Sequence, residues 1–249
     1  MRQDFSSFDG QRLSYLSAGA SEGMAVLLVH GFVSDAQTNW VKGGTVDALS
    51  AAGWRVIAPD LRGHGQSAKP HDDSAYPDDV LSRDQIALLD HLGIQDFHLA
   101  GYSLGAITAA RMIERSAQPS SVILSGMGSG LTQIDGRREQ FIDALTGKTP
   151  KTDPFAAMVT GFVKKTGGDA AALAHVMRGR KAVSAEALAK WDLPCLVLNG
   201  EKDNDNGSGD ALAGLIPGAR SQTIPGTHMD AIFKPDFAAA IAAWLGAQA

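Results

Sequence analysis

Length, composition and charge place the chain among globular domains and exclude several other classes. It has 249 residues, of which 44% are hydrophobic and 20% charged, and this suffices to bury a full core without disulfides or metals. The formal net charge is −5, and the lysines and arginines form no long run. Because a nucleic-acid binder needs a basic footprint, we expect a single domain with no nucleic-acid partner.

Cysteine content and hydropathy bear on the compartment. Cys195 is the only cysteine, which excludes an internal disulfide and a cysteine-based metal cluster, and its apolar neighbours predict a buried thiol. No stretch approaches the roughly 18 apolar residues of a membrane span, and residues 1–7 contain no apolar signal-peptide core. These observations favour a reducing cytoplasm and leave the oligomeric state open.

In chain order, the first predicted element is a β-hairpin over residues 5–18 that turns at Asp9-Gly10, a common type I′ pair. A continuous apolar run at 24–29 follows and ends at His30-Gly31. Such a run is typical of a strand that is buried on both faces of a parallel sheet. Further strands are predicted at 54–58, 97–100, 122–124 and 195–198, with a more polar edge strand at 220–224.

Helical patterns fall between these strands. One helix has an apolar stripe that ends at Gly93, and the stripe consists of Leu81, Leu88, Leu89 and Leu92. The last helix begins at Pro235 and buries one face, formed by Phe237, Ile241, Trp244 and Leu245. Strands that alternate with helices predict an α/β fold, with a mainly parallel central sheet and helices on both faces.

Residues 129–190 break this alternation, because they contain helical patterns and no convincing strand. We expect a helical insertion there, within a core formed by residues 1–128 and 191–249. One stripe of the insertion has the spacing of a single helix face: Phe155, Met158, Val159, Phe162 and Val163. We expect most of these side chains to pack in a core and at least one to reach the functional site.

The strongest functional motif is Gly101-Tyr102-Ser103-Leu104-Gly105, which matches G-x-S-x-G and stands between a predicted strand and a predicted helix. Glycines without Cβ atoms allow the sharp turn that lifts a serine hydroxyl clear of the sheet. The helix N-terminus beneath it favours developing negative charge. The motif and its context predict that Ser103 is a nucleophile, and the alternative is a glycine-rich turn without chemistry.

A serine hydroxyl needs a general base within hydrogen-bond reach. Among the seven histidines, His228 alone lies between the last predicted strand and the last predicted helix. That loop is at the C-terminal edge of the sheet, where ligand sites of α/β folds gather. His228 is therefore the predicted base, whereas His30 is predicted to brace the loop that contains it.

The base needs an acidic partner that holds its tautomer. The strand at 195–198 runs into an acidic loop, in which Asp203 is the predicted partner and Asp205 and Glu201 are the alternatives. This loop lacks the glutamate and the spacing of a calcium loop, so no metal site is predicted there.

An oxyanion intermediate needs two preorganised N–H donors. The serine turn supplies the backbone N–H of Leu104. The loop after the first parallel strand, His30-Gly31-Phe32, is predicted to supply the N–H of Phe32, because Gly31 lets its backbone approach the site closely.

Together these residues resemble the α/β-hydrolase family, whose order along the chain matches Ser103, Asp203 and His228. The resemblance covers nearly the whole chain. His-Gly-Phe at 30–32 looks like the family's oxyanion motif, and residues 129–190 match the position of its helical cap. The segment at 60–67, Asp-Leu-Arg-Gly-His-Gly-Gln-Ser, is similar to a mainly architectural loop of the esterase-like and peroxidase-like branches, which leaves His64 outside the catalytic set.

Two features separate the chain from some of these relatives. Ser103 stands where haloalkane dehalogenases and epoxide hydrolases have an aspartate nucleophile. After the acid, many relatives continue with an apolar residue and proline, whereas residues 204–209 here read Asn-Asp-Asn-Gly-Ser-Gly.

The predicted function is hydrolysis of a small-molecule ester or related acyl compound, without a cofactor, by Ser103, His228 and Asp203. Enzymes of the same fold that cleave a lactone, an amide or a carbon–carbon bond are the first alternative. A non-catalytic ligand-binding receptor on the same scaffold is the second, and turnover of a chromogenic ester discriminates between them. The natural substrate depends on the shape of the pocket, which the sequence does not define.

Overall fold

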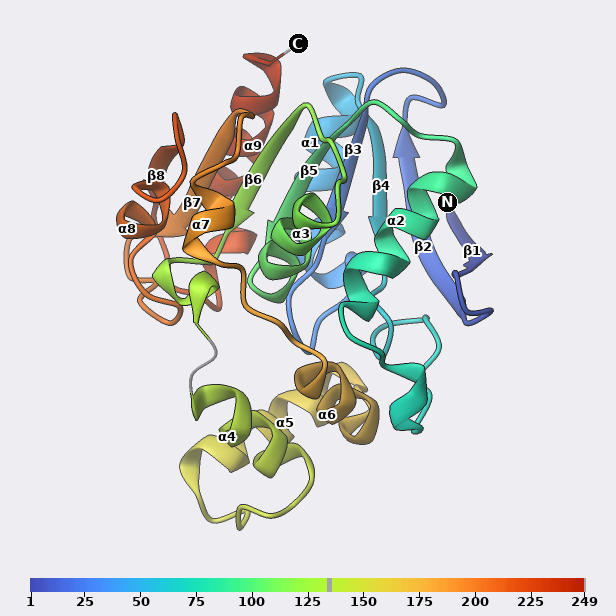
Figure 1. Ribbon diagram of the computed structural model, residues 1–249, viewed down its shortest axis with the longest axis vertical. Coiled ribbons are helices and arrows are strands. Elements are labelled where there is room, and N and C mark those ends of the chain that lie inside the picture. Colours follow the sequence, from blue (N-terminus) through green and yellow to red (C-terminus); the bar gives the residue numbers. More distant parts are fainter. Residues whose placement is uncertain (134–135, 249) are drawn as a thin grey trace.

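The computed structural model describes residues 1–133 and 136–248. In this part of the chain eight strands form one twisted sheet in the order β1-β2-β4-β3-β5-β6-β7-β8 (Figure 1). The strands are β1 (Arg2–Ser6), β2 (Arg12–Gly19), β3 (Ala25–Val29), β4 (Arg55–Pro59), β5 (Phe97–Tyr102), β6 (Ser121–Ser125), β7 (Cys195–Gly200) and β8 (Arg220–Ile224). The pairs β1–β2 and β2–β4 are antiparallel and the others are parallel, which confirms the predicted α/β class.

The N-terminal hairpin forms, but its predicted type I′ turn is wrong. The N–H of Ser7 donates to the carbonyl of Gln11, so the connection is a three-residue loop. Of its residues only Gly10 has a positive φ, 85°, whereas a type I′ turn needs two such residues. Asp9 is held instead by its carboxylate, which accepts hydrogen bonds from the buried guanidinium of Arg62. An ion pair with a residue that is distant in the sequence thus joins this turn to the core.

The central strands are buried on both faces, as their continuous apolar runs predict. Along β3, Leu27 and Val29 face one hydrophobic cluster, and Val26 and Leu28 face the other. The first cluster includes side chains of α2 (Val80–Leu92) and α3 (Leu104–Glu114), and the second those of α1 (Thr45–Ala51) and α9 (Pro235–Gly246). Gly93, with φ 62°, ends α2 as predicted. None of the helices in the described ranges combines the length and the apolar character needed to cross a bilayer.

The chain between β6 and β7 is helical. It contains a 3-10 turn (Ser129–Thr132), α4 (Gly136–Leu145), α5 (Pro154–Thr166), α6 (Ala170–Arg178) and the short α7 (Ala185–Leu188). Figure 1 shows α4, α5 and α6 beyond the C-terminal ends of the parallel strands. Residues 134 and 135, which fall inside the predicted insertion, and residue 249 of the predicted core lie outside the described residues. After β7 come α8 (Gly209–Ala213) and β8.

The helical segment has a small core of its own. Val159 and Val163 of α5 are buried there together with Leu145 and Leu173 from the neighbouring helices. Val33, from the loop after β3, belongs to the same cluster. The helical segment is therefore packed onto the loop that follows the first parallel strand.

The fold depends on a close approach between α3 and β3. A Cβ atom at Gly105 would lie 1.9 Å from the backbone carbonyl oxygen of Val29, which cannot move aside as a flexible side chain could. We expect Gly105→Ala to lower the free energy of unfolding by about 3 kcal/mol, the upper end of ordinary overpacking, as measured by urea denaturation.

Gly161, which lies on the exposed face of α5 with open space around its Cβ position, provides the matched control. Gly161→Ala should raise the stability by about 0.5–1 kcal/mol, since alanine is the better helix former. Equal effects of the two substitutions would contradict the proposed close approach.

Candidate active site

Ser103 occupies a strained turn between β5 and α3. Its backbone, with φ 54° and ψ −113°, lies outside the regions that L-residues ordinarily adopt. The N–H of Ser103 donates to the carbonyl of Ser125 at 2.8 Å, which anchors the turn to the end of β6. A Cβ atom at Gly101 would lie 2.2 Å from the carbonyl oxygen of Gly105. Both glycines of the pentapeptide are therefore required by the packing, as the motif predicts.

His228 lies beside this turn, in the loop after β8. Its Nε2 is 3.1 Å from Oγ of Ser103, and its Nδ1 is 3.0 Å from Oδ2 of Asp203. An ionised carboxylate only accepts hydrogen bonds, so Nδ1 carries the proton and Nε2 can accept from the serine hydroxyl. The three predicted side chains are thus joined in one hydrogen-bonded chain.

Asp203 is the acidic residue that contacts the imidazole. Its side chain is 2% exposed, and its second oxygen accepts the N–H of Asp205 at 3.2 Å. Asp205 itself pairs with Arg137, and Glu201 lies near the ammonium group of Lys202. The structure therefore places neither alternative acid against His228.

The loop that presents Asp203 is fixed to its neighbours. The N–H of Lys202 donates to the carbonyl of Gly226, close to His228, and Gly200 leaves room for this approach. Nδ2 of Asn206 donates to the carbonyl of Gly126 at 2.9 Å. These contacts fix the conformation of the loop, although its sequence lacks the proline that many relatives have after the acid.

Tyr102 is a functional candidate that the sequence reasoning missed. Its hydroxyl donates to the backbone carbonyl of His228 at 2.6 Å, and its ring centroid is 5.5 Å from that of the imidazole. Burial raises the pKa of Tyr102, so the hydroxyl remains a donor at neutral pH. The only available signal was its place before the serine in G-x-S-x-G, a position that the motif leaves open.

His30 braces the loop after β3, as predicted. Its Nδ1 lies 2.8 Å from the carbonyl oxygen of Gly31, and its Nε2 accepts the N–H of Leu61 at 2.9 Å. Burial lowers the pKa of His30, so its imidazole stays neutral and Nε2 can accept the hydrogen bond. His64 packs edge-on against His30 and Phe32, and burial lowers the pKa of His64 to about 3. Neither histidine contacts Ser103.

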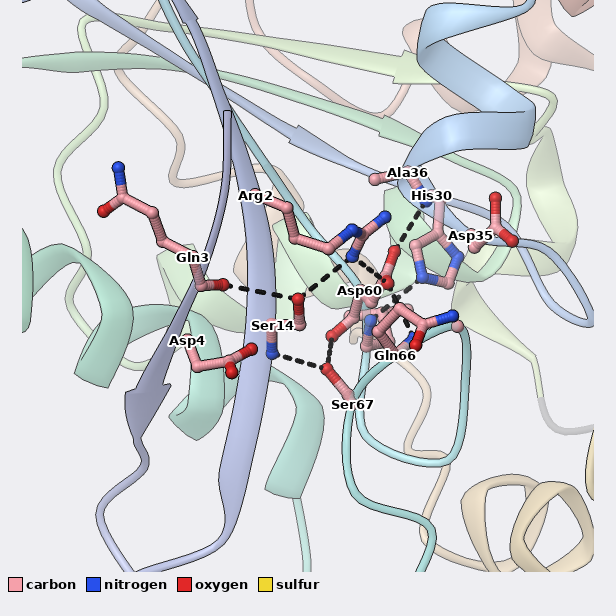
Figure 2. Close-up of polar contacts among 12 residues, drawn as sticks. Arg2, Gln3, Asp4, Ser14, His30, Asp35, Ala36, Asp60, Gln66 and Ser67 are labelled. Carbon is pink, nitrogen blue, oxygen red and sulfur yellow. Dashed lines mark hydrogen bonds and ion pairs between the residues drawn. The ribbon is translucent and has the colours of Figure 1, made fainter.

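Asp60, at the end of β4, ties this loop to the rest of the core. Figure 2 shows its carboxylate between three donors: the guanidinium of Arg2 at 2.6 Å and the N–H groups of Ala36 and Gln66 at 2.9 and 2.8 Å. The Asp60 side chain is fully buried, whereas the Arg2 side chain is 32% exposed, so the bond from the N–H of Ala36 is the one best shielded from water. The loops after β3 and β4 are held to the first strand by one carboxylate.

The two residues predicted to supply the oxyanion donors, Phe32 and Leu104, line the cavity that contains Ser103. Leu104 is the first residue of α3, so its N–H has no acceptor within the helix. Phe32, Ser103 and Leu104 line the same cavity of about 210 Å³. Their role as donors stays a prediction.

The wall of this cavity is mainly apolar. Three residues of the α5 stripe line it, namely Met158, Val159 and Phe162. Val159 and Phe162 also pack in the helical segment's own core, as do Phe155 and Val163. The structure therefore agrees with both parts of the expectation, since most of the stripe packs in a core and part of it also reaches the cavity that contains Ser103. Among the described residues, no cluster of three or more histidine, cysteine or acidic side chains could hold a metal ion.

Comparisons with known proteins agree with this fold. Residues 25–126 match the family model described as alpha/beta hydrolase fold. An esterase from Exiguobacterium antarcticum superposes with a TM-score of 0.80 at 18% identity, covering 99% of this chain and 100% of that chain. The enol-lactonase from Burkholderia xenovorans LB400 gives a TM-score of 0.79 at 22% identity, covering 98% and 100%.

Curated relatives match over shorter segments. The dihydrolipoyllysine-residue acetyltransferase component of the acetoin cleaving system from Pseudomonas putida is 37% identical over 126 residues, 49% of this chain and 32% of that protein. An epoxide hydrolase from Caballeronia sordidicola is 42% identical over 87 residues, 35% of this chain and 26% of that protein. The matches thus span about a third or less of these relatives. The match at 25–126 and the similar structures together show that the chain has the α/β-hydrolase fold.

Proposed function

We propose that this protein is a serine hydrolase that cleaves an ester or a related acyl compound through a covalent acyl-enzyme. The observation that carries the proposal is the hydrogen-bonded chain from Asp203 through His228 to Ser103, which ends at a strained strand-to-helix turn. A serine in this position attacks a carbonyl carbon, which favours acyl chemistry over the epoxide opening named for some relatives.

The chemistry follows from the proton positions. As Oγ of Ser103 bonds to the carbonyl carbon, Nε2 of His228 takes the hydroxyl proton and the carbonyl oxygen becomes an oxyanion. Collapse of this intermediate breaks the bond to the leaving group, to which His228 returns the proton. Water then attacks the acyl-enzyme by the same route and releases the acid and Ser103. Asp203 stays ionised, holds the tautomer of His228 and stabilises the imidazolium.

Stabilisation of the oxyanion is assigned to the backbone N–H groups of Phe32 and Leu104. One lies in the loop that His30 and Asp60 hold, and the other begins α3. Donors that are fixed before the reaction stabilise the developing charge without reorganising during the reaction. The helix N-terminus adds a favourable dipole at the same position.

Residues 129–190 are assigned to a cap over this site, with residues 1–128 and 191–249 as the catalytic core. Support comes from Met158, Val159 and Phe162, which are in the helical segment and line the cavity that contains Ser103. A cap of this kind limits the size of the substrate and excludes water from the reacting atoms.

The nucleophile assignment predicts that a fluorophosphonate probe labels the protein at one site. Ser103→Ala should abolish labelling and lower the turnover of a chromogenic ester by on the order of 10⁴-fold or more, because the three residues act as a unit. Intact-protein mass spectrometry and ester kinetics measure the two effects. Unchanged labelling of the variant would exclude Ser103, and a protein that binds but never turns over esters would be a receptor.

The acid assignment predicts different effects for two neighbouring aspartates. Asp203→Asn should lower kcat by on the order of 10⁴-fold, because an amide next to Nδ1 favours the wrong tautomer of His228. Asp205→Asn, the matched control, removes the same charge two residues away and should keep kcat within a few-fold, since Asp205 does not contact His228. Equal small effects on kcat would mean that neither aspartate is the acidic partner of His228.

A further inference from the structure

Val33 has a backbone conformation that is unusual for valine. It follows Phe32 in a turn after β3 and has a φ of 54°. Among the described residues, four that are not glycine have a positive φ, and Val33 is the only one of them with a β-branched side chain. Turn positions of this kind usually contain glycine or asparagine, because a branched Cβ is crowded by the backbone there. The surrounding structure must therefore hold Val33 in place.

The side chain of Val33 is held by the helical segment between β6 and β7. It is 5% exposed and lies in the hydrophobic cluster that contains Leu145 of α4, Val163 of α5 and Leu173 of α6. A return of residue 33 to an ordinary φ would redirect its Cβ and withdraw the side chain from this cluster. Apolar burial against the three helices thus opposes the backbone strain.

The preceding residue, Phe32, is assigned as an oxyanion donor. Among the described residues, no protein group accepts its N–H. Before it in the chain, the N–H of Gly31 donates at 2.8 Å to Oδ1 of Asn39, which is buried in the core. After it, Val33 is fixed in the helical segment, and the ring of Phe32 itself packs edge-on against Phe141 of α4. The assigned donor therefore lies between an anchor in the core and an anchor in the helical segment.

We propose that Val33 is a positioning residue for the oxyanion step: by holding its side chain, the helical segment keeps the N–H of Phe32 where the oxyanion forms. This inference rests on the proposed function. A donor stabilises the developing charge only when it is preorganised, so a small displacement of this N–H lowers the rate and leaves the binding of an uncharged ligand unchanged. The helical segment thus acts on the reacting atoms as well as on the size of the substrate.

The test uses two ligands of nearly equal shape: hexyl trifluoromethyl ketone and the corresponding alcohol. Oγ of Ser103 adds to the ketone carbon, the hydroxyl proton passes to Nε2 of His228, and the ketone oxygen becomes an oxyanion. The alcohol has no carbonyl carbon to attack and forms no oxyanion. The ratio of the two inhibition constants therefore reports the stabilisation of the oxyanion, and ester kinetics give kcat and KM for the same variants.

Val33→Ala should lower kcat by roughly 10- to 100-fold and weaken the ketone by a similar factor, while KM and the affinity for the alcohol stay within a few-fold. Val163→Ala is the matched control, because it removes the same two methyl groups from the same cluster at a position outside the cavity and outside the turn. It should reduce the resistance to urea to a similar extent and leave kcat and the ratio of the inhibition constants within a few-fold.

Val33→Gly separates the side chain from the shape of the backbone. Glycine adopts a positive φ without strain, so this variant folds even if Val33→Ala does not, yet it lacks the side chain that the helical segment holds. It should show the same loss of kcat and of ketone affinity. Full activity of Val33→Gly overturns the inference, as do equal effects of Val33→Ala and Val163→Ala on the ratio of the inhibition constants.

The unsubstituted protein tests the proposed function separately. If it neither hydrolyses the ester nor binds the ketone more tightly than the alcohol, the proposed function is contradicted and the inference is overturned with it. If it does both and the Val33 variants match it, the inference alone is overturned and the proposed function stands.

Discussion

The close packing of α3 against β3 is the constraint on which the site depends. At Gly105 the helix lies so near the carbonyl of Val29 that no Cβ atom fits between them. The chain must therefore turn sharply after β5, and Ser103 takes up the strain with a φ of 54°. The same approach brings Gly105, in the first turn of α3, close to the backbone carbonyl of His30. This backbone contact thus joins the helix that follows Ser103, the proposed nucleophile, to the strand that precedes the loop of Phe32, a proposed oxyanion donor.

His228, the proposed base, is held by the strand that precedes Ser103, the proposed nucleophile. Tyr102, the last residue of β5, binds the backbone carbonyl of His228 through its hydroxyl and packs its ring against the imidazole. Asp203, in the loop after β7, accepts the hydrogen bond from Nδ1 of the same ring. Since β5, β7 and β8 belong to one sheet, the geometry of the three residues is fixed by the rigid part of the fold.

Local rules made much of this structure predictable. Buried strands have continuous apolar runs, Gly93 ends α2, and the glycines at 101 and 105 satisfy a steric requirement that belongs to the pentapeptide itself. The turn at Asp9 was mispredicted because Asp-Gly also suits a three-residue loop, and the pairing of Asp9 with Arg62, 53 residues away, is not visible in the local sequence. Tyr102 was missed for a similar reason, since its hydrogen bond joins two segments that no sequence pattern relates. The choice among acids depended on loop geometry, which brings Asp203 alone to the imidazole.

The central claim is that Ser103 forms a covalent bond to the acyl group during turnover. Its most direct test is rapid acid quenching during hydrolysis of a 4-nitrophenyl ester, followed by peptide mass spectrometry. The proposed mechanism predicts a mass increase equal to the acyl group on the peptide that contains Ser103, together with a burst of nitrophenol in proportion to the enzyme. Steady turnover by a chain that stays unmodified, or an acyl group on another side chain, would contradict it.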